Sequence, residues 1–118
     1  MRRLPLLVAA LAAALAFGAV MLLSQGQGAV PERAEKATTG LKVFNRMGCG
    51  SCHRLAAAGS TGPIGPNLDE RLTSYTAESL EAKIVAPGEN GPMPSDFGER
   101  MTDAELDSLV GFLLASRR

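Results

Sequence analysis

The residues best suited to redox or metal chemistry lie in one short segment, Gly48–His53, which reads GCGSCH. This segment contains Cys49, Cys52 and His53, which are both cysteines and the only histidine of the 118-residue chain. Two thiols and one imidazole at this spacing could form a redox-active disulfide, contribute to a zinc site, act as a catalytic pair or hold a prosthetic group. The rest of the sequence distinguishes between these four interpretations.

Three of the four interpretations fit the surrounding sequence poorly. Redox-active Cys-x-x-Cys pairs normally follow a strand in a βαβ unit, and no segment shows the alternation typical of strands. A structural zinc site needs four ligands, whereas this segment offers three residues of suitable type crowded together. A catalytic cysteine and its histidine normally meet in space from separate elements rather than within one segment.

The spacing Cys49-Gly50-Ser51-Cys52-His53 is that of the attachment site for a c-type haem. Two thiols add across the two vinyl groups of one porphyrin, so their sulfurs must straddle one edge of the ring. A gap of two residues at helical geometry achieves this, and the histidine that follows can then reach the iron. Gly50 and Ser51 are small, so the backbone can approach the ring. We therefore expect one covalent haem c, with His53 as an axial iron ligand.

A single histidine excludes paired histidine ligation of the iron within one chain, so a second protein ligand would be methionine. Met47 is too close to Cys49 to reach the opposite face of the haem. Met93 lies between two prolines that restrict the backbone and could hold its thioether in place. We expect Met93 to be the second ligand, with Met101 or an open site as alternatives. An open site would instead indicate a ligand-binding sensor or a peroxidase-like enzyme.

The first 23 residues are predicted to direct the chain to a membrane. Leu4–Leu23 is a stretch of twenty uncharged residues, which suits a bilayer span, and Arg2 and Arg3 precede it. We expect a transmembrane signal-anchor over 1–23, with the two arginines in the cytoplasm and the rest of the chain exported. The alternative is a cleaved signal that leaves a secreted or periplasmic protein.

Residues 24–38 are polar and are predicted to form a linker, whose second half could already be helical from Pro31 and Glu32. Residues 39–118 then form the exported domain. Arg2 and Arg3 belong to the anchor, which leaves ten basic against twelve acidic residues in the exported part. No basic patch with interleaved aromatic residues is present, so nucleic acid is not an expected partner.

Three helices are predicted within the exported domain, over residues 39–47, 77–86 and 103–116. Thr76 is a candidate N-cap for the second helix, and Pro87 ends it. Thr102 and Glu105 form a capping box for the third helix, whose apolar residues recur at helical spacing. Long loops rich in glycine and proline connect the helices, and long loops in a small domain usually carry function. The expected fold class is all-α.

The chain resembles the class I cytochromes c, which are small electron carriers with one haem. The resemblance implies their fold, in which three main helices and long loops surround one covalently attached haem. It also implies that the carbonyl of Pro66 accepts a hydrogen bond from Nδ1 of His53, which leaves Nε2 for the iron. Five segments carry the resemblance: Gly40–Phe44 (GLKVF), Cys49–His53 (CGSCH), Gly65–Leu68 (GPNL), Met93–Phe97 (MPSDF) and Leu109–Leu113 (LVGFL).

The function implied by this resemblance is one-electron transfer between respiratory partner proteins in or on the membrane, without catalysis by the chain itself. The haem domain would lie on the extracytoplasmic side of the cytoplasmic membrane. The alternative is a haem c subunit or module of a larger complex, such as an oxidase, a quinol-oxidising complex or a dehydrogenase. The scattered basic residues Lys42, Arg46, Arg54 and Lys83 do not form the lysine-rich face that mitochondrial relatives present to their oxidase.

Overall fold

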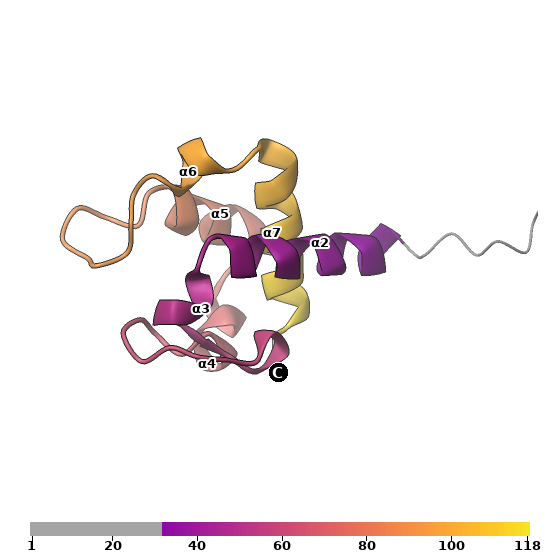
Figure 1. Ribbon diagram of the computed structural model, residues 1–118, viewed down its shortest axis with the longest axis horizontal. Coiled ribbons are helices and arrows are strands. Elements are labelled where there is room, and N and C mark those ends of the chain that lie inside the picture. Colours follow the sequence, from indigo (N-terminus) through magenta and orange to yellow (C-terminus); the bar gives the residue numbers. More distant parts are fainter. Residues whose placement is uncertain (1–31) are drawn as a thin grey trace, which may run out of the picture. The chain divides into compact units, whose positions relative to one another are not determined.

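Helix α2, Glu32–Arg46, is the first element of residues 32–118, the part of the chain that the computed structural model describes (Figure 1). Two of the later helices are long enough to dominate the fold, and the others are single turns. A two-stranded antiparallel sheet, in which Arg54 pairs with Thr61, lies between α3 and α4. The other elements are α3 Cys49–Cys52, β1 Arg54–Leu55, η1 Ala56–Ala58, β2 Ser60–Thr61, α4 Leu68–Arg71, η2 Leu72–Ser74, α5 Ala77–Val85, α6 Phe97–Arg100 and α7 Asp103–Ala115.

The first helix begins earlier than residue 39, where the sequence pattern placed its start. The residues from Glu32 to Thr38, assigned above to the linker, are already helical. Glu32 and Glu35 lie in the first turn, where negative charge interacts favourably with the helix dipole. Lys36 pairs with Asp107 on α7. This contact gives the polar first turns a tertiary partner, which their own sequence does not reveal.

The ends of α5 and α7 follow the predicted capping chemistry. The Thr76 hydroxyl accepts a hydrogen bond from the Ser79 amide at 3.2 Å. The Thr102 hydroxyl accepts one from the Glu105 amide at 3.2 Å, and the Glu105 carboxylate accepts one from the Thr102 amide at 2.9 Å. The capping box predicted for the last helix is thus confirmed, and α5 ends at Val85, two residues before the buried Pro87.

Helices α2 and α7 cross in close contact (Figure 1). At the crossing, a Cβ on Gly40 would collide with the backbone oxygen of Ser108 and with the Cβ of Phe112. The rings of Phe44 and Phe112 meet edge to face with centroids 6.1 Å apart. Glycine at position 40 is therefore a packing requirement, because any side chain would force the two helices apart.

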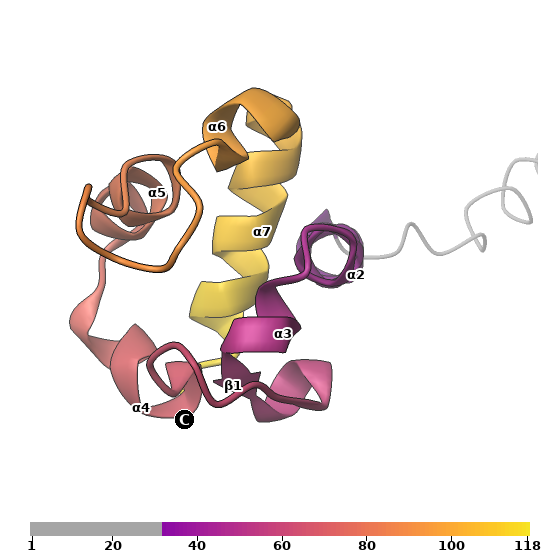
Figure 2. The same cartoon turned by 60° about the vertical axis from the view of Figure 1, so that its left-hand side comes forward.

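Helix α7 lies between α2 and α5, and the core forms where these helices meet (Figure 2). The loops after α3 and after α5 project to the same side of the described unit (Figure 1). The core of the described residues contains one apolar residue from the sheet and several from each long helix. Its members are Val43, Phe44, Leu55, Leu72, Leu80, Ile84, Phe97, Met101, Leu106, Leu109, Val110, Phe112 and Leu113.

The predicted membrane span, Leu4–Leu23, lies outside the described residues. Among residues 32–118, every helix is too short or too polar to cross a bilayer. The mostly helical fold of this part agrees with the predicted fold class, with the small β1–β2 sheet as an addition. Its strands have only two residues each, which is too short for an alternating pattern to be visible in the sequence.

Candidate haem-binding site

The two cysteines lie on α3, a single helical turn directly after α2. Gly48 connects the two helices in the left-handed region, with φ of 74°, which glycine adopts without steric cost. Cys49 and Cys52 begin and end the turn, both are half-buried, and no disulfide joins them. One helical turn therefore holds both thiols close together on one short element, as the attachment of a single ring requires.

His53 follows this turn in extended backbone conformation, with ψ of 136°. Its amide donates to the carbonyl of Cys49 at 2.9 Å. Its Nδ1 lies 2.9 Å from the carbonyl oxygen of Pro66. A carbonyl can only accept, so Nδ1 carries the proton and Nε2 keeps a free lone pair. None of the hydrogen bonds within residues 32–118 involves Nε2, so this nitrogen can bind a metal centre.

Gly65 brings the Pro66 carbonyl close to the imidazole. A Cβ on Gly65 would lie 2.6 Å from Nδ1 of His53, closer than real side chains approach. The amide of Gly65 donates to the carbonyl of Cys52 at 2.7 Å. The segment that the resemblance associates with the haem histidine thus packs directly against the ring of His53.

Burial raises the pKa of the Cys49 thiol to about 11 in the folded chain. A thiol with this pKa stays protonated at neutral pH and is a poor nucleophile, because the thiolate is the reactive form. The local environment of Cys49 therefore does not support the alternative of a catalytic cysteine–histidine pair.

The alternative of a zinc site also lacks ligands in the part of the chain that the structure describes. No group of three or more His, Cys, Asp or Glu residues there is arranged to hold a metal ion. The two thiols on one helical turn and the imidazole that follows them, with Nε2 unpartnered among the described residues, instead fit a group that is attached at one edge and bound by one nitrogen. This donor set suits haem c.

The three methionines among the described residues occupy different environments. Met101 is 8% exposed and belongs to the core, as expected of a residue just before the Thr102 cap. Met47 lies two residues before Cys49 and is half-buried. Met93 lies in the loop between α5 and α6, and it is the only residue of 88–96 that is not exposed. Its side chain packs against the same core as Cys49.

Two polar residues that the sequence reasoning did not single out stabilise the segment after Pro66. Asn67 caps α4 by accepting from the Asp69 amide at 3.2 Å and donating to the Glu70 carboxylate at 2.7 Å. Asp69 accepts from the Ala56 amide with both carboxylate oxygens, at 3.2 and 3.0 Å. The pattern Asn-x-x-Glu before a helix is a recognisable capping signal and could have revealed Asn67.

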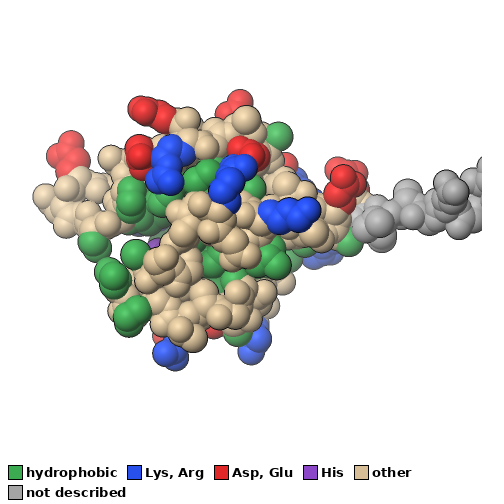
Figure 3. All heavy atoms as spheres, in the orientation of Figure 1, with side chains coloured by type: hydrophobic (Ala, Val, Ile, Leu, Met, Phe, Trp, Pro, Cys, Tyr) green, Lys and Arg blue, Asp and Glu red, His purple; other side chains and the backbone are tan. Residues whose placement is uncertain are grey.

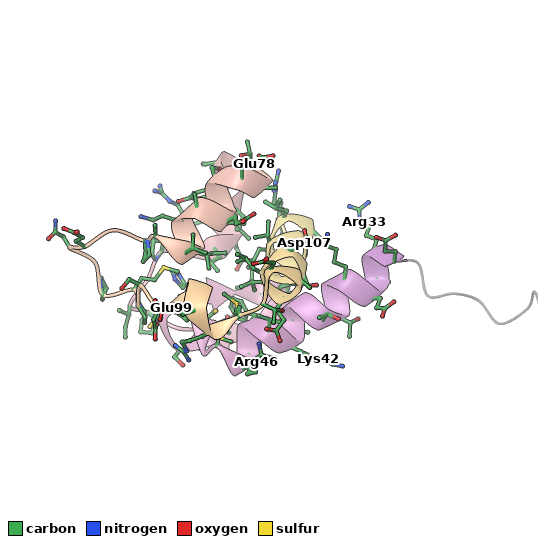
Figure 4. The ribbon with its side chains drawn as sticks, turned by 90° about the horizontal axis from the view of Figure 1, so that it is seen from above. Arg33, Lys42, Arg46, Glu78, Glu99 and Asp107 are labelled. Carbon is green, nitrogen blue, oxygen red and sulfur yellow. The ribbon has the colours of Figure 1, made fainter. Side chains whose placement is uncertain are left out.

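Basic side chains do not gather into one patch around α2. Lys42 and Arg46 point to one side of the helix, whereas Arg33 points to the opposite side (Figure 4). Arg46 is paired with Glu105 at 2.7 Å.

Hydrophobic side chains gather on one end of the face shown in Figure 3, where the loops project. Among the described residues, Ile64 is the most exposed large hydrophobic side chain, at 64%. It lies in the loop that carries Pro66. The loop side of the described unit is therefore more apolar than the surface over α2.

The families and structures that this chain matches are haem proteins, in agreement with the chemistry of the site. The family described as "Cytochrome C oxidase, cbb3-type, subunit III" matches residues 35–113, which is more than half of the chain. The chain therefore belongs to this family and is a class I c-type cytochrome with one haem.

Among solved structures, the chain is similar to the c-type cytochrome SorU from Sinorhizobium meliloti. The two share 30% sequence identity and superpose with a TM-score of 0.59. The match covers 70% of this chain and 91% of SorU. No curated protein gave a significant match. The predicted cofactor, covalently bound haem c with its iron, follows from the family, and so does electron transfer through the haem.

Proposed function

We propose that this protein is a one-electron carrier whose haem iron is bound by His53 and Met93. In this proposal Cys49 and Cys52 form the thioether bonds to the haem, and electrons pass between membrane-associated respiratory partners. Membership of the c-type cytochrome family supports the electron-transfer part. The hydrogen bond from Nδ1 of His53 to Pro66 supports the role of His53 as a ligand, because it leaves Nε2 for the iron.

The side chains have separate tasks in this proposal. The Pro66 carbonyl holds the proton on Nδ1 and fixes the tautomer of His53. Met93 supplies a thioether from the other side, and this pairing raises the reduction potential. The apolar core between α2, α5 and α7 excludes water, which also favours the less charged, reduced state. When bound, the haem supplies reversible one-electron oxidation and reduction of its iron.

The observation that carries the choice of Met93 is that it is half-buried within a loop whose other residues are exposed. Every other residue of 88–96 is exposed, so the loop turns this one side chain inward. A loop with two prolines and two glycines has no other apolar side chain of comparable length to pack.

The test is the far-red methionine–iron charge-transfer band of the ferric protein. We expect the band in the wild type, its loss in Met93→Ala, and a lower reduction potential in that variant. Met101→Leu is the matched control, because it replaces a buried methionine of similar volume and should keep the band. A wild type without the band, or a band that survives in Met93→Ala, would refute methionine ligation by Met93 and favour an open site.

The membrane part of the proposal has three pieces: an anchor over 1–23, a linker that follows it from residue 24, and a haem domain that begins with α2 at Glu32. Cytochrome c domains are typically extracytoplasmic, which agrees with the predicted orientation. In fractionated cells, we expect the full chain to stay with membranes after a high-salt wash and a chain lacking 1–23, exported with a cleavable signal, to be released. If the gene for the full chain yields a product in the soluble periplasmic fraction that is shortened at its N-terminus, the first residues act instead as a cleaved signal.

A second candidate function is that of a haem subunit in a larger oxidoreductase complex. The description of the matching family, an oxidase subunit, favours it specifically. The two functions differ in the native state of the protein after mild detergent extraction. A subunit would migrate in blue native electrophoresis with an oxidase activity, whereas a free carrier would migrate at its own mass. Neither function assigns catalysis to this chain.

A further inference from the structure

The segment between α3 and α4 folds back onto the haem-attachment turn. β1 and β2 form a hairpin in which Leu55 pairs with Ser60. Residues 59–66, which include β2, pass along α3 and end at Pro66, whose carbonyl contacts His53. We call these residues the clasp loop. The clasp loop is therefore the part of the chain that surrounds His53.

The clasp loop holds the peptide groups on both sides of His53. Before His53, the Cys52 carbonyl accepts a hydrogen bond from the Gly65 amide at 2.7 Å. After it, the carbonyl of His53 itself accepts one from the Ser60 hydroxyl at 2.9 Å. The Ser60 hydroxyl also lies 3.4 Å from the Leu55 carbonyl, a longer and weaker contact. Ser60 is partly buried, so water competes little for this bond.

The clasp loop also touches the turn without any side chain between them. A Cβ on Gly62 would lie 2.5 Å from the carbonyl carbon of Cys52 and 2.6 Å from the carbonyl oxygen of Gly50. Both atoms belong to the backbone and cannot rotate away. A Cβ on Gly50 would in turn lie 2.8 Å from the Cβ of Ser60. Ser60 is thus packed at a fixed distance from the turn and is not a freely rotating surface hydroxyl.

Together these contacts account for every polar atom of His53 except Nε2. The amide donates to Cys49, the carbonyl accepts from Ser60, and Nδ1 donates to Pro66. Ser60 and Pro66 belong to the same clasp loop, so one loop holds both the backbone and the ring of His53. If the bond from Ser60 is lost, the peptide after His53 is held only by the β1–β2 pairing that starts at Arg54, and the ring and its bond to Pro66 can adjust.

We propose that Ser60 is a positioning residue that sets the orientation of the His53 imidazole plane through its hydrogen bond to the His53 carbonyl. This inference rests on the proposed ligation of the iron by His53. Outer hydrogen bonds of this kind orient metal-binding histidines and tune the metal centre. Ser60 does not itself reach the iron ligand atom; it acts through the backbone.

The readout is the set of hyperfine-shifted proton resonances of the ferric holoprotein. The shifts of the four haem methyl groups depend on the orientation of the axial ligand planes, and a gain or loss of stability alone does not move them. A first experiment on the wild type, with labelled histidine, tests whether His53 is a ligand at all. If its shifted signals are missing, the proposed ligation fails, whatever Ser60 does.

If His53 is a ligand, the variants test Ser60. We expect Ser60→Ala to shift the methyl resonances and Ser60→Thr, which keeps the hydroxyl, to retain the wild-type pattern. Ser108→Ala is the matched control, because its hydroxyl donates to the Ala104 carbonyl at 2.8 Å within α7, which is not part of the clasp loop. An unchanged pattern in Ser60→Ala would overturn the inference. The same shift in Ser60→Thr, or in Ser108→Ala, would overturn it too, since the hydroxyl bond would not be the cause.

Discussion

His53 shows how a single side chain is given one defined role by its neighbours. Its Nδ1 is occupied by Pro66, and its ring lies against the bare backbone of Gly65. Gly65 and Pro66 are successive residues, so a side chain at position 65 would also move the Pro66 carbonyl away from Nδ1. Glycine is needed there because the backbone approaches the ring more closely than any side chain would allow.

Gly65→Ala should therefore damage the site more than an ordinary loop substitution would. The new Cβ must displace the ring of His53 or the loop, and overpacking of this kind costs roughly 1–3 kcal/mol. We expect a lower yield of holoprotein and a lower free energy of unfolding by chemical denaturation. Gly98→Ala is the control, since a Cβ there would make only ordinary contact with Val85 at 3.4 Å. Equal behaviour of the two variants would contradict this account of Gly65.

Glu105 should make the free energy of unfolding depend on pH. The hydrogen bond from Arg46, supported by the Thr102 amide, lowers the pKa of this carboxyl to about 2. In the unfolded chain its pKa is about 4.3. A lowered folded pKa adds stability above the unfolded pKa, and this contribution disappears as the pH falls through the folded pKa.

We therefore expect Glu105→Gln to be less stable than the wild type at neutral pH. The difference should shrink below about pH 4.3 and be nearly gone near pH 2. Urea unfolding at several pH values measures it, with Glu99→Gln as a control for removing an exposed carboxylate. A difference that stays constant over this range would show that Glu105 acts through shape and not through charge.

At the scale of elements, the contact between α2 and α7 includes one glycine from each helix. Gly40 on α2 faces α7, and Gly111 on α7 faces α2. A Cβ on Gly40 would meet the backbone of Ser108, which cannot yield. A Cβ on Gly111 would meet the aliphatic part of Lys36, with its nearest atom at 3.3 Å, and this flexible side chain can shift. Both positions lie inside helices, where alanine is intrinsically favoured by up to about 1 kcal/mol.

Gly40→Ala should consequently destabilise the protein by about 1–3 kcal/mol, because the helices must separate. Gly111→Ala should be neutral or slightly stabilising, by at most about 1 kcal/mol. Thermal and urea unfolding of the two holoproteins provide the comparison. A loss in neither variant would mean that helix propensity and not the crossing decides the outcome. A loss in both would show that Lys36 does not shift to admit the new Cβ at position 111.

The elements also show which parts of the fold can be predicted from sequence. The starts of α5 and α7 could be predicted because Thr76 and Thr102 cap the helices through residues only three positions away. The start of α2 at Glu32 could be predicted only as a possibility from Pro31 and Glu32, because the contact of Lys36 with Asp107 lies far along the chain. The single-turn helices are too short for a periodic pattern to develop.

The same distinction applies to the candidate site. The turn that carries Cys49 and Cys52, with His53 after it, is a local motif, so its spacing could be recognised directly in the sequence. The contact between Ser60 and His53 depends on a hairpin with strands of two residues, and a serine in a loop carries no signal of its own. Met93 is an intermediate case, because its flanking prolines mark the loop but do not show which way the side chain turns.

For the whole molecule, the small number of apolar core residues limits the stability that the chain can reach by itself. The core of the described residues has thirteen hydrophobic members, with no tryptophan in the chain. Domains of this size are marginally stable on core burial alone. A covalently held haem adds a large apolar body to such a core.

The chain expressed without haem attachment should therefore be largely unfolded. Hydrogen exchange measures this directly, with the holoprotein as the reference. We expect amides of α2 and α7 to be protected in the holoprotein and to exchange freely without haem. Strong protection of these helices in the haem-free chain would show that their crossing is sufficient for folding.

The positions of the two proposed ligands along the chain have a consequence for folding kinetics. His53 and Pro66 are 13 residues apart and joined by a short hairpin, whereas Met93 follows His53 by 40 residues. Closing the longer segment costs more chain entropy, and the loop around Met93 has little packing of its own, since its other residues are exposed. The histidine side should form first during folding. The methionine side should be the first to detach under denaturing stress, before α2 and α7 separate.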